Sequence, residues 1–145
     1  MATFRGSYQH SIDHKGRVSI PARFRRVLGG ENDTVVILRG LDTCVWLYSV
    51  EEFQRFEDRL RARSVGDEAT RRFQRMLLVD SRDETLDAQG RVAIPPRLIA
   101  HAQLEKDVLV IGVMDRMEIW NPALFEQYLK SSNRTYEDIA GEILL

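Results

Sequence analysis

The chain carries one sequence pattern twice, and this internal repeat constrains its fold more than any other feature. Residues 13–24 and 87–98 align at a constant spacing of 74 positions and share seven residues. In order, the shared residues are an aspartate, a glycine, an arginine, a valine, an isoleucine, a proline and a second arginine. A looser match continues through residues 35–49 and 108–121, where the spacing slips to 72. This self-similarity predicts two copies of a unit of about 70 residues with loops of unequal length, the boundary lying within residues 65–78.

Local patterns in the first copy predict strands around a glycine-containing turn. The turn has the pattern Asp-x-x-Gly and is flanked by two apolar segments. Glycine adopts positive φ at little cost, so this pattern is typical of a β-hairpin, and the second copy should contain the same turn. Further strands are expected where β-branched and aromatic residues cluster. The expected strands of the first copy are Phe4–Ile12, Val18–Ile20, Thr34–Leu38 and Cys44–Tyr48.

Helices are expected after the strands of each copy. Pro21 and Pro95 each follow a strand and suit the first turn of a short helix, where the missing N–H would be unpaired anyway. The pair Gly29–Gly30 would end the first of these helices. Ser49 and Glu52 have the spacing of a capping box, which marks the start of another helix. The remaining expected helices are residues 50–63, a helix capped by Asn121 that begins at Pro122, an extra helix at Glu68–Leu78 and a terminal helix at Thr135–Leu144.

These elements predict a mixed α/β (α+β) fold with the strands in the middle and helices at the flanks. One unit of this size closes a poor core alone, so the two copies should pair about a pseudo-twofold axis. We divide the chain into repeat 1 (1–66), a linker helix (67–78), repeat 2 (79–132) and a C-terminal helix (133–145). Six apolar side chains on the helices are expected in the core or, in part, at subunit contacts: Phe53, Phe56, Phe73, Met76, Phe125 and Tyr128.

Composition excludes several classes of protein. The apolar runs are far shorter than the roughly 20 residues that a membrane span needs. The N-terminal residues lack a signal-peptide pattern, so we expect a cytoplasmic location and no membrane partner. A single cysteine, Cys44, rules out an internal disulfide, and its strand-like surroundings predict a small buried hydrophobe.

Charge is distributed unequally between the two halves of the chain. The total of 21 basic and 22 acidic side chains gives a net charge of −1, which argues against a generic polyanion binder. Residues 1–75 nevertheless carry a net +4, whereas residues 76–145 carry −5. The basic residues between 55 and 75 alternate with acids, which indicates a solvated or intersubunit helix face. Any nucleic acid would therefore bind locally, near the first repeated turn.

The repeated turn has two compatible interpretations. Each aspartate could pair with the arginine four residues later and stabilise its own turn, which needs no ligand. Alternatively, the turns present cations and amides to phosphates and base edges of double-stranded DNA, because a two-stranded ribbon fits the major groove. An aspartate that holds an arginine would also prepare it for such a contact. The candidate DNA-binding residues are Asp13, Lys15, Arg17, Asp87, Gln89 and Arg91.

No pattern of a catalytic or metal site is present in the sequence. The three histidines His10, His14 and His101 lack metal-ligand spacing, and neither a phosphate loop nor a nucleophile elbow occurs. Asp42 and Asp115 occupy equivalent repeat positions and are interpreted as turn residues. We therefore expect no enzymatic activity, no metal, no cofactor and no small-molecule substrate.

The residues of the first motif and its repeat resemble the MraZ family of bacterial transcriptional regulators. The resemblance rests on residues 4–8 and 12–25 and on the tandem Asp-x-x-x-Arg motifs, and it covers essentially the whole chain. It implies two fused SpoVT-AbrB-like, swapped-hairpin units that form a ring-shaped homo-oligomer. It also implies a repressor, associated with the nucleoid, that binds direct repeats in the promoter of the division and cell-wall gene cluster.

The resemblance assigns DNA contact to the loops Asp13–Arg17 and Asp87–Arg91. Arg17 and Lys15 would contact base edges and phosphates, Asp13 would orient Arg17, and Arg91 would be the second reading residue. The second loop departs from the first because Gln89 replaces the lysine, which implies weaker contact or contact through an amide. Arg23 and Arg97 are further candidates, with pairing to the turn aspartates as the alternative role. The competing function is an antitoxin-like or protein-interaction module with the same fold.

Overall fold

The computed structural model describes residues 3–28 and 33–145 of the chain. The expected helix end at Gly29–Gly30 lies outside these residues. The strands are β1 (Phe4–Ser11), β2 (Arg17–Ser19), β3 (Thr34–Arg39), β4 (Cys44–Ser49), β5 (Arg82–Thr85), β6 (Arg91–Ala93), β7 (Asp107–Met114) and β8 (Arg116–Trp120). The helices are α1 (Ala22–Leu28), α2 (Val50–Arg61), α3 (Glu68–Leu78), α4 (Pro96–Ala102), α5 (Pro122–Lys130) and α6 (Tyr136–Leu144). This mixture of helices and antiparallel sheet is the α+β class that the sequence predicts.

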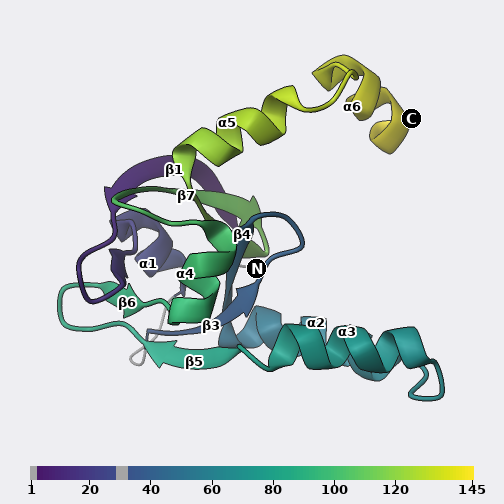
Figure 1. Cartoon of the computed structure of the whole chain (residues 1–145), viewed down its shortest axis with the longest axis horizontal. Coiled ribbons are helices and arrows are strands. Elements are labelled where there is room, and N and C mark those ends of the chain that lie inside the picture. The colour runs from purple at the N-terminus through teal and green to yellow at the C-terminus, as the bar shows by residue number, and fades with distance from the viewer. Residues whose placement is uncertain (1–2, 29–32) are drawn as a thin grey trace.

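The two copies exchange strands within one six-stranded antiparallel sheet. The strand order is β1-β7-β8-β4-β3-β5, so β1 of the first copy pairs with β7 of the second, and β5 of the second pairs with β3 of the first. The two central strands, β4 and β8, pair with each other across the pseudo-twofold axis. Figure 1 shows the sheet wrapped around the short helices α1 and α4. Each copy therefore depends on the other for an edge strand.

Only the turn of the hairpin expected in each repeat is present, because the two strands that flank it do not pair along their length. β1 and β2 meet only at the base of the turn, through an isolated bridge between Ile12 and Val18 and a bond from the Asp13 N–H to the Arg17 carbonyl at 3.0 Å. β2 pairs instead with β6 in a separate two-stranded sheet. Ile20, which follows β2, also bonds to the other copy, because its N–H donates to the Gly90 carbonyl at 2.9 Å. The strand after the turn thus finds its partner in the other repeat rather than in its own.

Buried side chains form a core on each face of the sheet. Val45 and Leu47 of β4 belong to a cluster with β2, β6, α1 and α4. The alternating residues Cys44, Trp46 and Tyr48 belong to a second cluster, under α2, α3 and α5. β4 is buried on both faces, which explains its nearly continuous apolar sequence. Cys44 is fully buried as expected, and burial raises the pKa of its thiol to about 12.

A buried carboxylate joins the two central strands at the pseudo-twofold axis. Glu118 is 6% exposed and accepts hydrogen bonds from the indole N–H groups of Trp46 at 3.0 Å and Trp120 at 2.9 Å. Its charge is paired with Arg116, whose guanidinium also lies over the Trp46 ring at 4.5 Å. Both carboxylate oxygens are therefore satisfied, which is what a buried charge requires.

The longer helices begin at the capping residues that the sequence predicts. The Ser49 side chain accepts the Glu52 N–H at the start of α2, and the Asn121 side chain accepts the Ala123 N–H at the start of α5. In Figure 1 the pair α2 and α3 extends from one side of the sheet, and α5 and α6 form a second arm.

Some apolar residues of these arms lie outside the core. Phe53, Phe56 and Phe125 pack against the second cluster. Phe73, Met76 and Tyr128 are instead 37%, 50% and 49% exposed. The core position expected for these three side chains is therefore wrong.

Candidate nucleic-acid interface

The first repeated turn is built around the carboxylate of Asp13. Its Oδ1 accepts the backbone N–H groups of Lys15 and Arg17, each at 2.9 Å, and its Oδ2 accepts the Arg17 Nε–H at 2.8 Å. The Gly16 N–H donates to the Asp13 carbonyl at 2.9 Å, and Gly16 has a φ of +76°. One carboxylate thus fixes both the turn and the orientation of the arginine, which confirms the predicted Asp–Arg pairing.

The second turn repeats this arrangement bond for bond. Asp87 Oδ1 accepts the N–H groups of Gln89 and Arg91, each at 2.9 Å, and Oδ2 accepts the Arg91 Nε–H at 2.9 Å. Gly90 has the same φ of +76° as its counterpart in the first turn. Two turns of identical design are therefore present, as the repeat predicts.

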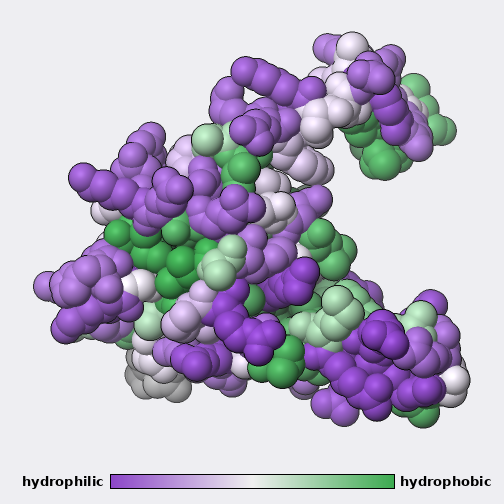
Figure 2. Space-filling view, viewed as in Figure 1, coloured by the Kyte–Doolittle hydropathy of each residue, from purple (hydrophilic) through white to green (hydrophobic). Residues whose placement is uncertain are grey.

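The two turns interlock on the ribbon formed by β2 and β6. The Ile94 N–H bonds to the Gly16 carbonyl at 2.8 Å, which mirrors the bond between Ile20 and Gly90. The Arg91 Nη1 atom also lies 3.8 Å from Asp13 Oδ2, so a charged contact crosses between the repeats. Figure 1 shows both turn loops at the same end of the molecule, and Figure 2 shows mainly hydrophilic residues there.

Hydrogen bonding keeps the turn aspartates ionised. Bonds from the Arg17 backbone N–H and side chain outweigh partial desolvation and lower the pKa of Asp13 from 3.8 to about 2. The equivalent bonds from Arg91 lower the pKa of Asp87 in the same direction. Both arginines therefore face a permanent anion at neutral pH, and their geometry does not change with modest changes of pH.

The remaining donors of the turns face solvent. Lys15 and Gln89 are exposed, and the side chains of Arg17 and Arg91 are 27% and 28% exposed. The Arg17 Nη groups have no partner among the described residues, because only its Nε is used by Asp13. Such a guanidinium can still donate two parallel bonds to a phosphate or a guanine edge.

The two additional arginine candidates do not pair with the turn aspartates. The Arg97 Nε atom lies 3.2 Å from Asp80 Oδ1, while its side chain is 75% exposed. Arg23 is exposed and forms no ion pair with any residue in the described parts of the chain. The expected alternative, a structural role in holding Asp13 or Asp87, is therefore wrong for both.

Sequence reasoning missed one cation at the second turn, Arg25. A Cβ atom on Gly90 would lie 2.8 Å from both Cδ and Cζ of Arg25, so this guanidinium packs directly on the glycine backbone. The buried Arg25 Nε has no hydrogen-bond partner within residues 3–28 and 33–145. At the first turn the equivalent position is Ile99, whose Cδ1 packs on Gly16. Positions 25 and 99 are equivalent in the repeat, since they differ by the same 74 residues, but the sequence carries no signal that places either side chain on the turn of the other copy.

The second basic region of the sequence lies away from the turns. Arg55, Arg61 and Arg72 form ion pairs with acids one helical turn earlier on α2 and α3. Figure 1 shows these helices on the opposite side of the sheet from the turn loops. Their charges are paired within these helices, and they do not continue the turn surface.

Features of other site classes are lacking in the part of the chain that the structure covers. No group of three or more potential metal-ligating side chains is found among the described residues. Within the same residues, no helix is both long and apolar enough to cross a bilayer.

A family model and individual proteins of known name point to the same family for this chain. The family model named "MraZ protein", whose description also contains "antitoxin-like", matches residues 3–76 and 78–141. A protein named transcriptional regulator MraZ from Alkaliphilus metalliredigens is 43% identical over 140 residues, covering 97% of this chain and 96% of that protein. Proteins with the same name from Caldanaerobacter subterraneus and Acetivibrio thermocellus are 42% and 40% identical over 95% and 98% of this chain, and over 94% and 97% of their own lengths.

Proposed function

This chain belongs to the MraZ family, and from that membership we propose that it is a DNA-binding transcriptional regulator that reads duplex DNA with its two repeated turns. The observation that carries the proposal is the pair of arginines, Arg17 and Arg91, each held by an aspartate at about 2.8–2.9 Å on one two-stranded ribbon. A guanidinium fixed in this way loses little conformational freedom on binding, which favours a specific contact. The names of its relatives support the same class of function.

Each turn residue has a distinct role in this proposal. Arg17 and Arg91 donate to base edges, since two parallel N–H groups match the acceptors of guanine in the major groove. Lys15 contacts a phosphate as a point charge, and Gln89 contacts a base or phosphate through its amide. Arg25 supplies a positive charge at the second turn, where the uncharged Gln89 replaces the lysine of the first. Arg23 and Arg97 contribute phosphate contacts at the flanks.

The proposed target genes follow from family membership. The protein represses its own division and cell-wall gene cluster by binding direct repeats in the promoter, and it acts in the cytoplasm at the nucleoid. It carries out no catalysis and takes no small-molecule substrate.

Self-association accounts for DNA binding by a chain of nearly neutral charge. Several copies, arranged as a ring, present their turns to successive repeats of the operator. Later contacts then form at high effective concentration, so affinity exceeds that of one copy. A single copy binds weakly.

A titration with DNA tests the proposal. The probe is a fluorescent duplex from the region upstream of the gene, compared with a scrambled duplex at several salt concentrations. Arg17→Ala weakens specific binding by about 1–3 kcal/mol for each bidentate arginine–guanine pair that it removes, and wild-type affinity falls steeply with salt. The matched control is Arg72→Ala, which removes an exposed arginine of α3 and leaves binding unchanged.

The outcome also separates the second candidate function. The "antitoxin-like" description of the family model favours a module that binds a protein partner. Absent or salt-insensitive binding to the upstream duplex, together with a tight protein partner, would replace the regulator with that module. Unchanged affinity of Arg17→Ala would overturn the assignment of the turn.

A further inference from the structure

The C-terminal helix α6 has a well-defined start and an apolar side that is exposed. Its start is fixed by a capping box, in which the Thr135 side chain accepts the Asp138 N–H and the Asp138 side chain accepts the Thr135 N–H. Tyr136, Ile139 and Ile143 follow one another at helical spacing and are 83%, 40% and 74% exposed. A nine-residue helix is marginal in water on its own, so this apolar stripe calls for a partner surface.

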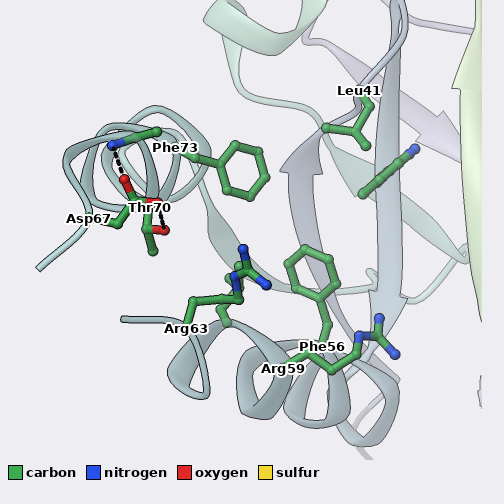
Figure 3. A pocket seen from close by; sticks show the side chains of 10 residues that line it. Leu41, Phe56, Arg59, Arg63, Asp67, Thr70 and Phe73 are labelled. Carbon is green, nitrogen blue, oxygen red and sulfur yellow. Dashed lines mark hydrogen bonds between the residues drawn. The ribbon is translucent and has the colours of Figure 1, made fainter. Parts of the chain in front are cut away.

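A groove of matching character lies at the other arm of the molecule. It occupies about 420 Å³ between α2, α3 and the loop before β4. Figure 3 shows Leu41, Phe56 and Phe73 facing this space, with Arg59 and Arg63 on the α2 side. Leu41 is 68% and Phe73 is 37% exposed, so the apolar wall is open to solvent.

The two surfaces are complementary in charge as well as in hydropathy. Residues 55–75 carry seven arginines and four acids, whereas residues 133–145 carry three acids and one arginine. Neither Arg59 nor Arg63 forms an ion pair with any described residue, and Glu137 at the start of α6 is equally unpaired within that part of the chain. An acidic, apolar helix therefore matches a groove with an apolar wall and a rim on which Arg59 and Arg63 outnumber the one acid, Asp67.

We infer that the groove between α2 and α3 binds helix α6 of a second copy of this chain. In Figure 1, α6 lies at the end of its own arm, apart from α2 and α3 of the same chain. Because the donor and acceptor surfaces are different patches of one subunit, the contact is head to tail, and it closes into a ring when the helix of the last subunit occupies the groove of the first. The inference rests on the proposed self-association but is independent of DNA binding.

The test is the molar mass of the protein in solution without DNA, measured by light scattering during size exclusion. Wild-type protein has a mass several times the 16.8 kDa of one chain. Ile143→Asp, which blocks the helix, and Leu41→Asp, which blocks the groove, each reduce the mass to that of one chain. Both side chains are exposed, so both variants keep the far-ultraviolet spectrum and melting temperature of a folded subunit. Met114→Asn, a control at the 67% exposed last residue of β7, which has a positive φ, keeps the wild-type mass.

Mixing the two blocked variants gives the sharpest result. Ile143→Asp retains an intact groove and Leu41→Asp retains an intact helix, so an equimolar mixture forms a species of twice the single-chain mass and nothing larger. A mixture that stays at the single-chain mass, or variants that keep the wild-type mass, would overturn the inferred contact while leaving self-association standing. A wild-type protein that is monomeric at every concentration would overturn both.

Discussion

At the scale of single residues, the two turns differ in where their second cation comes from. The first turn carries Lys15 within its own loop, whereas Gln89 replaces it in the second. Arg25 packs on Gly90 and restores a positive charge there from the other repeat. Its equivalent at the first turn is the apolar Ile99. Each turn therefore has a second positive charge, from its own loop at the first turn and from α1 at the second.

Replacing Arg25 with isoleucine tests its role at the second turn. Arg25→Ile copies the packing already used by Ile99 on Gly16, so the fold tolerates it while the positive charge disappears. Because the variant neutralises one phosphate fewer, the slope of log affinity against log salt falls by about 0.9 per subunit on the upstream duplex. Adding Gln89→Lys to this variant restores the slope, because the cation then sits where the first turn has its lysine.

The measured effects of Arg25→Ile and Arg17→Ala distinguish a packing role of Arg25 from a role in DNA binding. If Arg25→Ile keeps the wild-type salt slope while Arg17→Ala weakens specific binding, DNA binding stands and Arg25 has only a packing role. Thermal unfolding of both variants, compared with wild type, excludes a general loss of structure.

The depressed pKa of Asp13 predicts how the turn responds to acid. The folded-state pKa of about 2 lies below the ordinary 3.8, so the carboxylate stabilises the fold at and above that ordinary value. This contribution disappears as pH falls through about 2, and Asp87 behaves in the same direction. Between about pH 5 and 8 neither aspartate titrates, and DNA affinity shows no transition from them.

Carbon-detected NMR of the aspartate carboxyl groups measures these midpoints directly. In Arg17→Ala the Asp13 midpoint rises only part of the way to 3.8, because the backbone N–H of residue 17, its largest source of stabilisation, remains. A wild-type midpoint at or above 3.8 would show that the carboxylate does not accept these bonds in solution.

At the scale of secondary-structure elements, β1 is held by an unusually close approach to β7. Gly112 lies opposite Gly6 in this pairing, and a Cβ on Gly112 would lie 2.5 Å from both the Arg5 nitrogen and the Phe4 carbonyl carbon. Backbone atoms cannot rotate away as a side-chain end can. The glycine therefore allows the exchanged strand to pack against the other repeat.

Gly112→Ala should separate β1 from β7 locally. Overpacking of this kind costs about 1–3 kcal/mol of unfolding free energy, measured by denaturant titration, and amide protons of β1 exchange faster. Gly141→Ala is the matched control, since nothing lies within 4 Å of the added carbon on α6. Unchanged stability and exchange in Gly112→Ala would mean that the strands adjust while their pairing persists.

Most elements could be predicted from the sequence, but their partners could not. The cap residues Ser49 and Asn121 and the turn glycines are local signals, and the structure confirms them. The hairpin expected around Asp13 failed because the choice between β1 and β6 as the partner of β2 depends on contacts some 70 residues apart. The position of Arg25 on Gly90 was missed for the same reason, since only the exchange of strands brings α1 to the second turn.

At the scale of the whole molecule, the exchanged strands make the two repeats one folding unit. An isolated fragment of residues 1–66 lacks β7, the partner of β1, and β5, one of the two partners of β3. A fragment of residues 79–145 likewise lacks β3, the partner of β5, and β1, one of the two partners of β7. Neither half retains a complete sheet, although both carry the repeated turn.

We therefore expect neither half to fold as a monomer. Circular dichroism of each fragment should show little structure at low concentration, and any structure gained at high concentration should coincide with dimers that supply the missing strands. The full chain should unfold in one cooperative step. A folded monomeric half would contradict this prediction and would support independent domains with the proposed boundaries.

The fusion of two unequal turns into one chain also gives the binding surface a direction. A dimer of identical subunits presents the same surface after a half-rotation and so suits inverted half-sites. Here Lys15 and Ile99 lie at one turn, and Gln89 and Arg25 lie at the other. A half-rotation about the pseudo-twofold axis therefore places a different surface where the first one was. A duplex in contact with both turns would therefore bind in one orientation only. If neighbouring subunits share that orientation, their binding sites would all run in the same direction along the promoter.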